Sequence, residues 1–387
     1  MNYPVALLTL LLGVLSALAG CASGPAMQAP DDLFRDAWFE PARVDIDPAA
    51  PLALSPAMRD YLAQLSPAWA APSDPRHRLL EVLRRGDLKI DYDAATTRTA
   101  AQAFDAREGN CLALVLMTAA LARHLGLDVH YQSVLGEDVW DRAGDLFISV
   151  GHVNLRLEER LDPRASVWNR SGETVIDFLA PVDAERLPTR QIAERTVVAM
   201  YMNNRAVESL TQGHVDDAYW WTRAALRQDR GLLSAYVTLG VVYQQRHHPE
   251  LSEAVLERVA QRAPDDVVAM SNRIVALREL GRRAEADALS ARLRELDPEP
   301  PYSYFQRGMD ALRDGKPEVA RRFFTREVER APYHAEFEYW LAVSYAQLND
   351  AERAAQHLQR AVEGSSTRSD RQLYSAKLER LKAHRMQ

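Results

Sequence analysis

The chain has 387 residues, of which 47% are hydrophobic and 26% are charged. This balance is typical of a globular protein and excludes wholesale disorder, collagen and a simple coiled coil, while the length predicts two or three domains. The formal net charge of −7 provides no basic surface for nucleic acid, so we expect no nucleic-acid partner.

The first 20 residues contain no charged side chain, and their apolar run from Val5 to Ala19 is 15 residues long. A helix of that length is too short to cross a hydrocarbon core of about 30 Å comfortably, but it fits the apolar part of a secretory signal peptide. The pattern therefore predicts a signal peptide at residues 1–20.

Small residues precede the first of the two cysteines in Leu18-Ala19-Gly20-Cys21. This motif resembles the bacterial lipobox, whose cysteine is acylated and becomes the first residue of the mature protein. The resemblance implies lipidation of Cys21 and a protein anchored to a membrane of the bacterial cell envelope. The resemblance also implies the outer membrane and not the inner one, because Ala22 and not an aspartate follows the cysteine, and we expect the protein at the periplasmic face. The alternative is an ordinary signal peptide followed by a cysteine that occurs there by chance.

Residues 21–75 contain nine of the 20 prolines. This composition predicts an extended tether, anchored through its lipid, that is followed by short helices. Ser55-Pro56 and Asp74-Pro75 each combine an N-cap residue with proline at the first helical position, so we expect a helix to begin at each pair.

Residues 76–190 mix helical and strand patterns, which predicts an α+β domain. The stretch that begins at Cys111 and ends at Gly126 is apolar on nearly all sides and is expected to form a buried central helix. Strand-like segments follow at residues 128–134, 146–157 and 174–179. One helix followed by consecutive strands indicates an antiparallel sheet.

Cys111 is the one thiol that remains if Cys21 is lipidated, so disulfides are not expected to stabilise the fold. Its place at the start of a helix favours the thiolate, because the helix dipole is positive there. An activated cysteine also needs a base within hydrogen-bond reach and an acceptor that orients the base. The alternative is a buried and unreactive cysteine.

Two histidines, His130 and His152, lie in predicted strands and are candidates for this base. His124 is excluded because it lies about 20 Å from Cys111 along the same helix. His152 has the better setting, since the neighbouring Gly151 permits close approach of another segment.

Strand alternation places Asn154 on the same face as His152. Asp177 stands in an otherwise apolar strand, where a buried carboxylate requires a partner, and an imidazole is a suitable one. The residue pattern therefore brings one cysteine, one histidine and one aspartate forward as a candidate site.

Three stretches of this region together resemble the transglutaminase-like superfamily: Thr99–Phe104, Arg107–Cys111 and Ala119–Leu127. The resemblance implies a papain-like core with Cys111 as the nucleophile, His152 as the general base and acid, and Asp177 as the group that orients His152. An aromatic residue is common two positions after this histidine in the superfamily, and Asn154 stands there in this chain.

Beyond about residue 198, proline, glycine and alanine recur at intervals of 34 or 68 residues, at Pro264, Pro298 and Pro332, at Gly213, Gly281 and Gly315, and at Ala218, Ala286, Ala320 and Ala354. A 34-residue helix–turn–helix unit with small residues at the helix crossings resembles the tetratricopeptide repeat. The resemblance implies an all-α solenoid of about five repeats over residues 198–387, with a C-terminal capping helix. Tyr219-Trp220-Trp221 lies at packing positions of the first repeat, which predicts core side chains.

We expect a lipid-anchored periplasmic cysteine enzyme, a peptidase, amidase or acyl transferase that forms a thioester on Cys111. Hydrolysis and transamidation share every step up to that thioester, so both stay open. The repeats would bind a partner protein or peptide in their concave groove. The alternative is a non-catalytic assembly scaffold that uses both regions for interaction. No cofactor and no metal are expected, because the sequence shows no nucleotide loop and no metal-ligand cluster.

Overall fold

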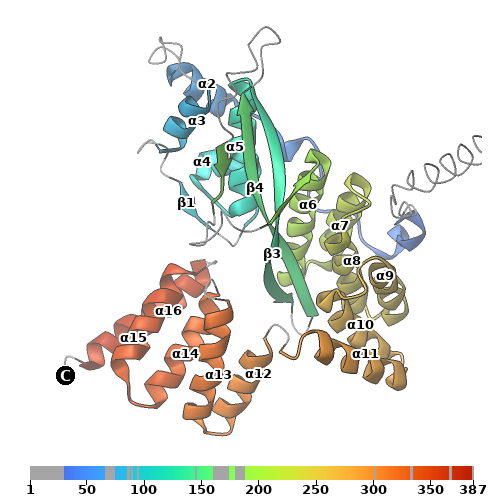
Figure 1. Cartoon of the computed structure of the whole chain (residues 1–387), viewed down its shortest axis with the longest axis vertical. Helices are drawn as coiled ribbons and strands as arrows, with labels where there is room; N and C mark the ends of the chain where they lie inside the picture. The colour runs from blue at the N-terminus through green and yellow to red at the C-terminus, as the bar shows by residue number, and fades with distance from the viewer. Residues whose placement is uncertain are drawn as a thin grey trace, which may run out of the picture. The chain divides into compact units, whose positions relative to one another are not determined.

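The computed structural model describes residues 30–65, 75–84, 88, 90–93, 96–143, 146–159, 174–178, 188–299, 302–331, 334–365 and 368–385. The predicted signal peptide and Cys21 lie outside these residues. The chain divides into two compact units at Phe34 and Arg35. In the first unit, the described residues form one short helix, η1 (Pro30–Leu33). All other described elements belong to the second unit (Figure 1).

The second unit begins with short helical elements, which are η2 (Asp36–Trp38), η3 (Ala50–Leu52), α2 (Pro56–Leu65), α3 (Pro75–Arg84) and α4 (Ala100–Ala106). The predicted helix starts at Pro56 and Pro75 are confirmed. At the first of them, the backbone N–H of Met58 donates to the Ser55 hydroxyl at 3.2 Å, as an N-cap serine requires.

The strands form a four-stranded sheet and a separate short pair, with bounds β3 (Leu127–Ala143), β4 (Leu146–Glu159), β5 (Thr174–Ile176) and β6 (Thr189–Ile192) for the sheet, and β1 (Asp91–Tyr92) and β2 (Glu108–Gly109) for the pair. The sheet has the order β5-β4-β3-β6 with every neighbour antiparallel, which confirms the predicted antiparallel sheet. The pair β1–β2 is parallel.

Strand β3 continues well past the predicted end at residue 134. The polar Gly136-Glu137-Asp138 interrupts the apolar alternation, which is why the sequence pattern stops there. In the structure this stretch coincides with a register shift between Ser133 and Asp138, after which pairing with β4 resumes. A local irregularity can therefore end the sequence signal of a strand without ending the strand.

The helix predicted to begin at Cys111 is α5 (Cys111–His124), and it is confirmed as a buried helix. Every residue from Cys111 to Ala122 is buried. Gly126 follows in the left-handed region with φ of 79°, where glycine has no steric penalty. Helix α5 contacts both β3 and β4, so it forms the core on which the sheet packs.

The C-terminal half is helical, with bounds α6 (Glu194–Thr211), α7 (Val215–Gln228), α8 (Leu233–Gln245), α9 (Pro249–Arg262), α10 (Val267–Glu279), α11 (Arg283–Leu296), α12 (Ser303–Arg313), α13 (Pro317–Arg330), α14 (Ala335–Gln347), α15 (Ala351–Glu363) and α16 (Arg368–Arg385). Consecutive helices pack in pairs from α6–α7 to α14–α15, and α16 packs on α15 (Figure 1). The array begins at Glu194, a few residues before the predicted position.

A left-handed residue lies in the turn within each helix pair, at Gly213, His247, Gly281, Gly315 and Asn349. These five positions follow one another at intervals of 34 residues. The sequence period in glycine therefore reflects a backbone requirement of the turn, and two repeats meet that requirement with another residue.

We expect His247→Gly to raise the free energy of unfolding by about 0.5–1 kcal/mol, because a side chain at φ of 59° is strained and glycine is not. Asn349→Gly is the matched control and should gain less, since asparagine tolerates this conformation better than most residues. Urea unfolding of both variants measures the difference. A loss of stability in His247→Gly would contradict the explanation.

Candidate functional site

Cys111 is the first residue of α5, and Asn110 caps the helix. The side-chain oxygen of Asn110 accepts from the backbone N–H of Ala113 at 2.9 Å, and its amide donates to the Thr97 hydroxyl at 2.7 Å. The cap orients the helix start and leaves the positive end of the helix dipole at the thiol. Cys111 is 8% exposed.

Gly109 allows the backbone before α5 to pack closely against the first turn of this helix. A Cβ atom at this position would lie 2.9 Å from the Cβ of Ala113 and 3.3 Å from Leu114. The sequence Gly-Asn-Cys therefore combines close packing, helix capping and a thiol in three consecutive residues.

His152 and Asp177 lie in direct contact. His152 Nε2 is 2.9 Å from Asp177 Oδ1 and 3.0 Å from Oδ2, and the histidine is only 2% exposed. The strand register explains the contact: Leu155 pairs with Ile176, so Asp177 follows β5 opposite Asn154, two residues from His152 on the same strand face. His152 itself stands opposite the register shift of β3.

Asn154 is a member of this cluster that the sequence reasoning did not select. Its side-chain amide donates to Asp177 Oδ2 at 3.1 Å, and the residue is 5% exposed. Its place on the face of His152 was visible in the strand alternation, and that was the signal that could have identified it. Asp177 thus has two side-chain partners on β4, which hold the carboxylate toward the imidazole.

The charge state of His152 is set by its neighbours. Burial lowers the pKa of His152, but the Asp177 hydrogen bond and the nearby Cys111 outweigh burial and raise this pKa to about 10. Nδ1, the ring nitrogen not used by Asp177, is buried without a partner of full hydrogen-bond geometry. Cys111 is therefore close enough to influence the charge state of the imidazole.

The start of α5 is also connected to the helical array. The backbone N–H of Thr97 donates to Glu208 Oε1 on α6 at 2.6 Å, and Thr97 in turn accepts from Asn110. Burial raises the pKa of Glu208. A hydrogen-bonded chain of three residues thus joins the first helix of the array to the cap of the helix that carries Cys111.

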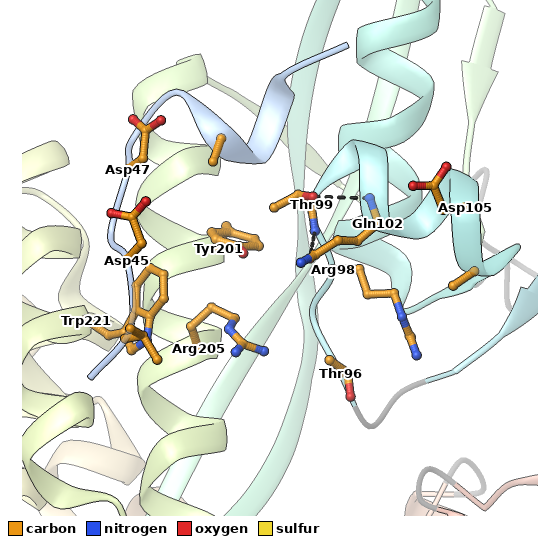
Figure 2. A pocket seen from close by; sticks show the side chains of 13 residues that line it. Asp45, Asp47, Thr96, Arg98, Thr99, Gln102, Asp105, Tyr201, Arg205 and Trp221 are labelled. Atoms are coloured by element: carbon orange, nitrogen blue, oxygen red, sulfur yellow. Dashed lines mark hydrogen bonds between the residues drawn. The ribbon is translucent and has the colours of Figure 1, made fainter. Parts of the chain in front are cut away.

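A cavity of about 610 Å³ lies beside this chain of residues. Its lining includes acidic, basic and aromatic side chains: Asp45, Asp47, Arg98, Tyr201, Arg205 and Trp221 (Figure 2). Arg98 pairs with Asp93 and Glu108, and Arg205 pairs with Glu208, so both cations are already neutralised. The cavity lining does not include Cys111, His152 or Asp177, and the two features are distinct.

Within the part of the chain that the structure describes, no cluster of three or more His, Cys, Asp or Glu residues has the geometry to hold a metal ion. Among the same residues, no helix combines the length and apolar character needed to cross a bilayer.

The helical array is similar to a known family of repeats. Residues 305–369 match the family model of the tetratricopeptide repeat, which confirms the repeat prediction for this part of the chain. A search of the curated proteins found no significant match.

Particular solved structures are similar to part of the chain. YrrB, described as a TPR protein with an unusual peptide-binding site, is 23% identical, with 46% of this chain and 92% of that chain covered and a TM-score of 0.25. A thermophilic TPR protein of Thermus thermophilus is 17% identical, with 46% and 98% covered and a TM-score of 0.32. MamA is 19% identical, with 43% and 95% covered and a TM-score of 0.24.

Proposed function

We propose that the protein is a transglutaminase-like cysteine enzyme of the bacterial cell envelope that transfers or hydrolyses acyl groups through Cys111. The observation that carries the proposal is the buried His152, which contacts Asp177 through Nε2 and leaves Nδ1 without a hydrogen-bond partner among the described residues. A histidine that is cationic at neutral pH beside a cysteine at a helix N-terminus is the arrangement that a thiolate nucleophile needs.

In the proposed reaction, the Cys111 thiolate attacks the carbonyl carbon of an amide and a C–S bond forms. His152 donates its proton to the nitrogen of the leaving amine as the C–N bond breaks, which leaves a thioester on Cys111. His152, now neutral, takes a proton from water or from an acceptor amine, whose attack releases the acyl group. Asp177, which accepts a hydrogen bond from Asn154, holds the imidazole orientation throughout.

An activated ester tests the proposal without knowledge of the natural substrate. The full chain, treated with p-nitrophenyl acetate, is expected to release p-nitrophenolate and to carry an acetyl group on Cys111, located by peptide mass spectrometry. Cys111→Ala is the control and should lose this label. A wild-type chain that is acetylated only on surface amines would contradict the enzyme proposal.

The scaffold alternative has one observation in its favour, since Cys111 is nearly buried and lies outside the lining of the cavity. In that case the helical array alone would carry the function by binding a protein or peptide partner. The same acetylation experiment separates the two proposals, because a scaffold does not require a reactive thiol.

The membrane anchor is a separate proposal that rests on the Leu18–Cys21 motif. Lipidation would place the protein on the periplasmic face of the outer membrane, where each acyl CH₂ contributes about 0.8 kcal/mol of membrane binding. Cells that express the protein should incorporate labelled palmitate into the wild-type chain and not into Cys21→Ala. Equal labelling of the two chains would overturn the proposal.

A further inference from the structure

A segment before the sheet region packs on the first repeats. We call residues 35–43 the strap, and Phe39 is its apolar anchor, 7% exposed. The Phe39 ring stacks on Tyr219 of α7 with centroids 3.8 Å apart and planes 3° apart, and it lies 6.2 Å from the Tyr243 ring of α8. The Arg246 guanidinium lies 5.5 Å from the centre of the Phe39 ring. These residues form an aromatic and cationic contact site for one phenyl ring.

Asp36, three residues before Phe39, occupies a separate contact site on α7. Its carboxylate accepts from the Tyr219 hydroxyl at 2.7 Å and pairs with Arg223 at 2.7 Å. Burial and the Asp36 hydrogen bond raise the pKa of Tyr219, so the phenol keeps its proton and acts as the donor. The surface of the repeats therefore contacts two side chains of the strap, an acidic residue and, three positions later, an aromatic residue.

Side chains of α7 also hold the strap backbone. The N–H of Arg35 donates to the Tyr219 hydroxyl at 2.8 Å, and the N–H of Arg43 donates to Asp217 at 2.8 Å. Trp220 Nε1 donates to the carbonyl of Glu40 at 2.6 Å. Side-chain recognition of main-chain groups, combined with contact sites for two side chains, is how a protein surface binds a short peptide segment.

The expectation of core side chains in Tyr219-Trp220-Trp221 is confirmed for Tyr219 and Trp221, which are buried, and the strap gives this stretch a second set of contacts. Tyr219 is fully buried, as a packing residue would be, but its hydroxyl makes two hydrogen bonds to the strap. Trp220 also contacts the strap, through its hydrogen bond to the Glu40 carbonyl. The aromatic sequence therefore combines repeat packing with contact to another segment.

We propose that the surface of α7 and α8 is a peptide-binding site for short segments that form a 3-10 turn with an acidic residue three positions before an aromatic residue, and that the strap is its intramolecular occupant. The proposal goes beyond the enzymatic one, because it requires no reactive Cys111. A tethered segment competes at an effective concentration of the order of millimolar, so it blocks the site against weaker peptides in solution.

The strap is also continuous with the cavity. The chain passes directly from Arg43 to Val44, Asp45 and Asp47, which line the cavity (Figure 2). Release of the strap would therefore free one wall of the cavity, and binding of an external peptide to α7 and α8 would be coupled to its opening.

The test measures fluorescence anisotropy of a fluorescein-labelled peptide of residues 35–43 against the full chain. Phe39→Ala in the chain weakens the strap, so this variant should bind the peptide at least 10-fold more tightly than the wild-type chain. Glu40→Ala is the matched control, since Glu40 has an exposed side chain and contributes its backbone, and it should behave as wild type. A peptide in which the Phe39 equivalent is alanine should bind neither chain.

Equal binding by the wild-type and Phe39→Ala chains, or none by either, would overturn the proposal. Hydrogen exchange of the Asp36→Ala variant provides a second measurement. The Asp36 side chain is 44% exposed, so its removal leaves no cavity in the core. The amides of Arg35, Glu40 and Arg43 should lose protection together by at least 10-fold while α7 stays protected. Unchanged protection of the three, or joint loss with α7, would show that the strap is an inseparable part of the fold and would equally overturn the proposal.

Discussion

Alanine at Cys111 and alanine at His152 are each expected to reduce acyl transfer from p-nitrophenyl acetate to the protein by at least about 100-fold. The reason is that the two side chains act as one unit: the thiolate is the nucleophile, and the imidazole holds the charge that stabilises it. The double variant should therefore lose little more than either single variant. Stopped-flow release of p-nitrophenolate measures all three rates.

The pH dependence separates this mechanism from that of an ordinary thiol. Because the His152 pKa is raised to about 10, the imidazole stays cationic through neutral pH. Alkylation of Cys111 by iodoacetamide at neutral pH should therefore be faster in the wild-type chain than in His152→Ala, and this advantage should disappear as pH rises through about 10 and His152 loses its charge. The stabilising contribution of the charged His152 is fully present below its unfolded pKa of about 6.5 and is lost as pH rises through about 10.

His130→Ala is the matched histidine control. His130 lies on β3, where its partner is Gln191 at 3.3 Å, away from the His152–Asp177 contact. Its replacement should leave both the acylation rate and the alkylation profile unchanged. Asp177→Asn should slow acylation less than His152→Ala, because an asparagine at position 177, opposite Asn154, keeps a side-chain oxygen that can accept from His152 Nε2. An equal loss in His130→Ala and His152→Ala would refute the assignment of the base.

Gly308→Ala is expected to destabilise the repeat array by about 1–3 kcal/mol. Gly308 lies on α12, and an added Cβ atom would stand 2.6 to 2.9 Å from three ring atoms of Phe324 on α13. That ring is fully buried and packs edge-on against Phe305, so it has no space into which it could move. The methyl group must therefore separate α12 from α13.

Gly240→Ala provides the comparison at the equivalent position two repeats earlier. Its added Cβ atom would meet Leu256 at 3.0 Å, and a leucine side chain can adjust more readily than a confined aromatic ring. Thermal unfolding followed by circular dichroism should show the larger loss in Gly308→Ala. A larger loss in Gly240→Ala would contradict the packing argument.

The sequence by itself determined those features that depend on neighbouring residues or on a regular period. The 34-residue spacing of Gly213, Gly281 and Gly315 predicted the array, because each turn requires a left-handed residue at the same place. The Gly109-Asn110-Cys111 motif predicted a buried helix with a thiol at its start, because capping and helix formation are local.

Only the tertiary structure decided which distant side chains meet. His152 and Asp177 are 25 residues apart in sequence, and their contact depends on the register between β4 and β5. Phe39 and Tyr219 are separated by a far longer stretch, and no periodic signal marks the strap as a ligand of α7 and α8. Local patterns determine which surfaces form, but the pairing of two surfaces depends on shape and charge complementarity across the whole fold, and sequence spacing does not encode it.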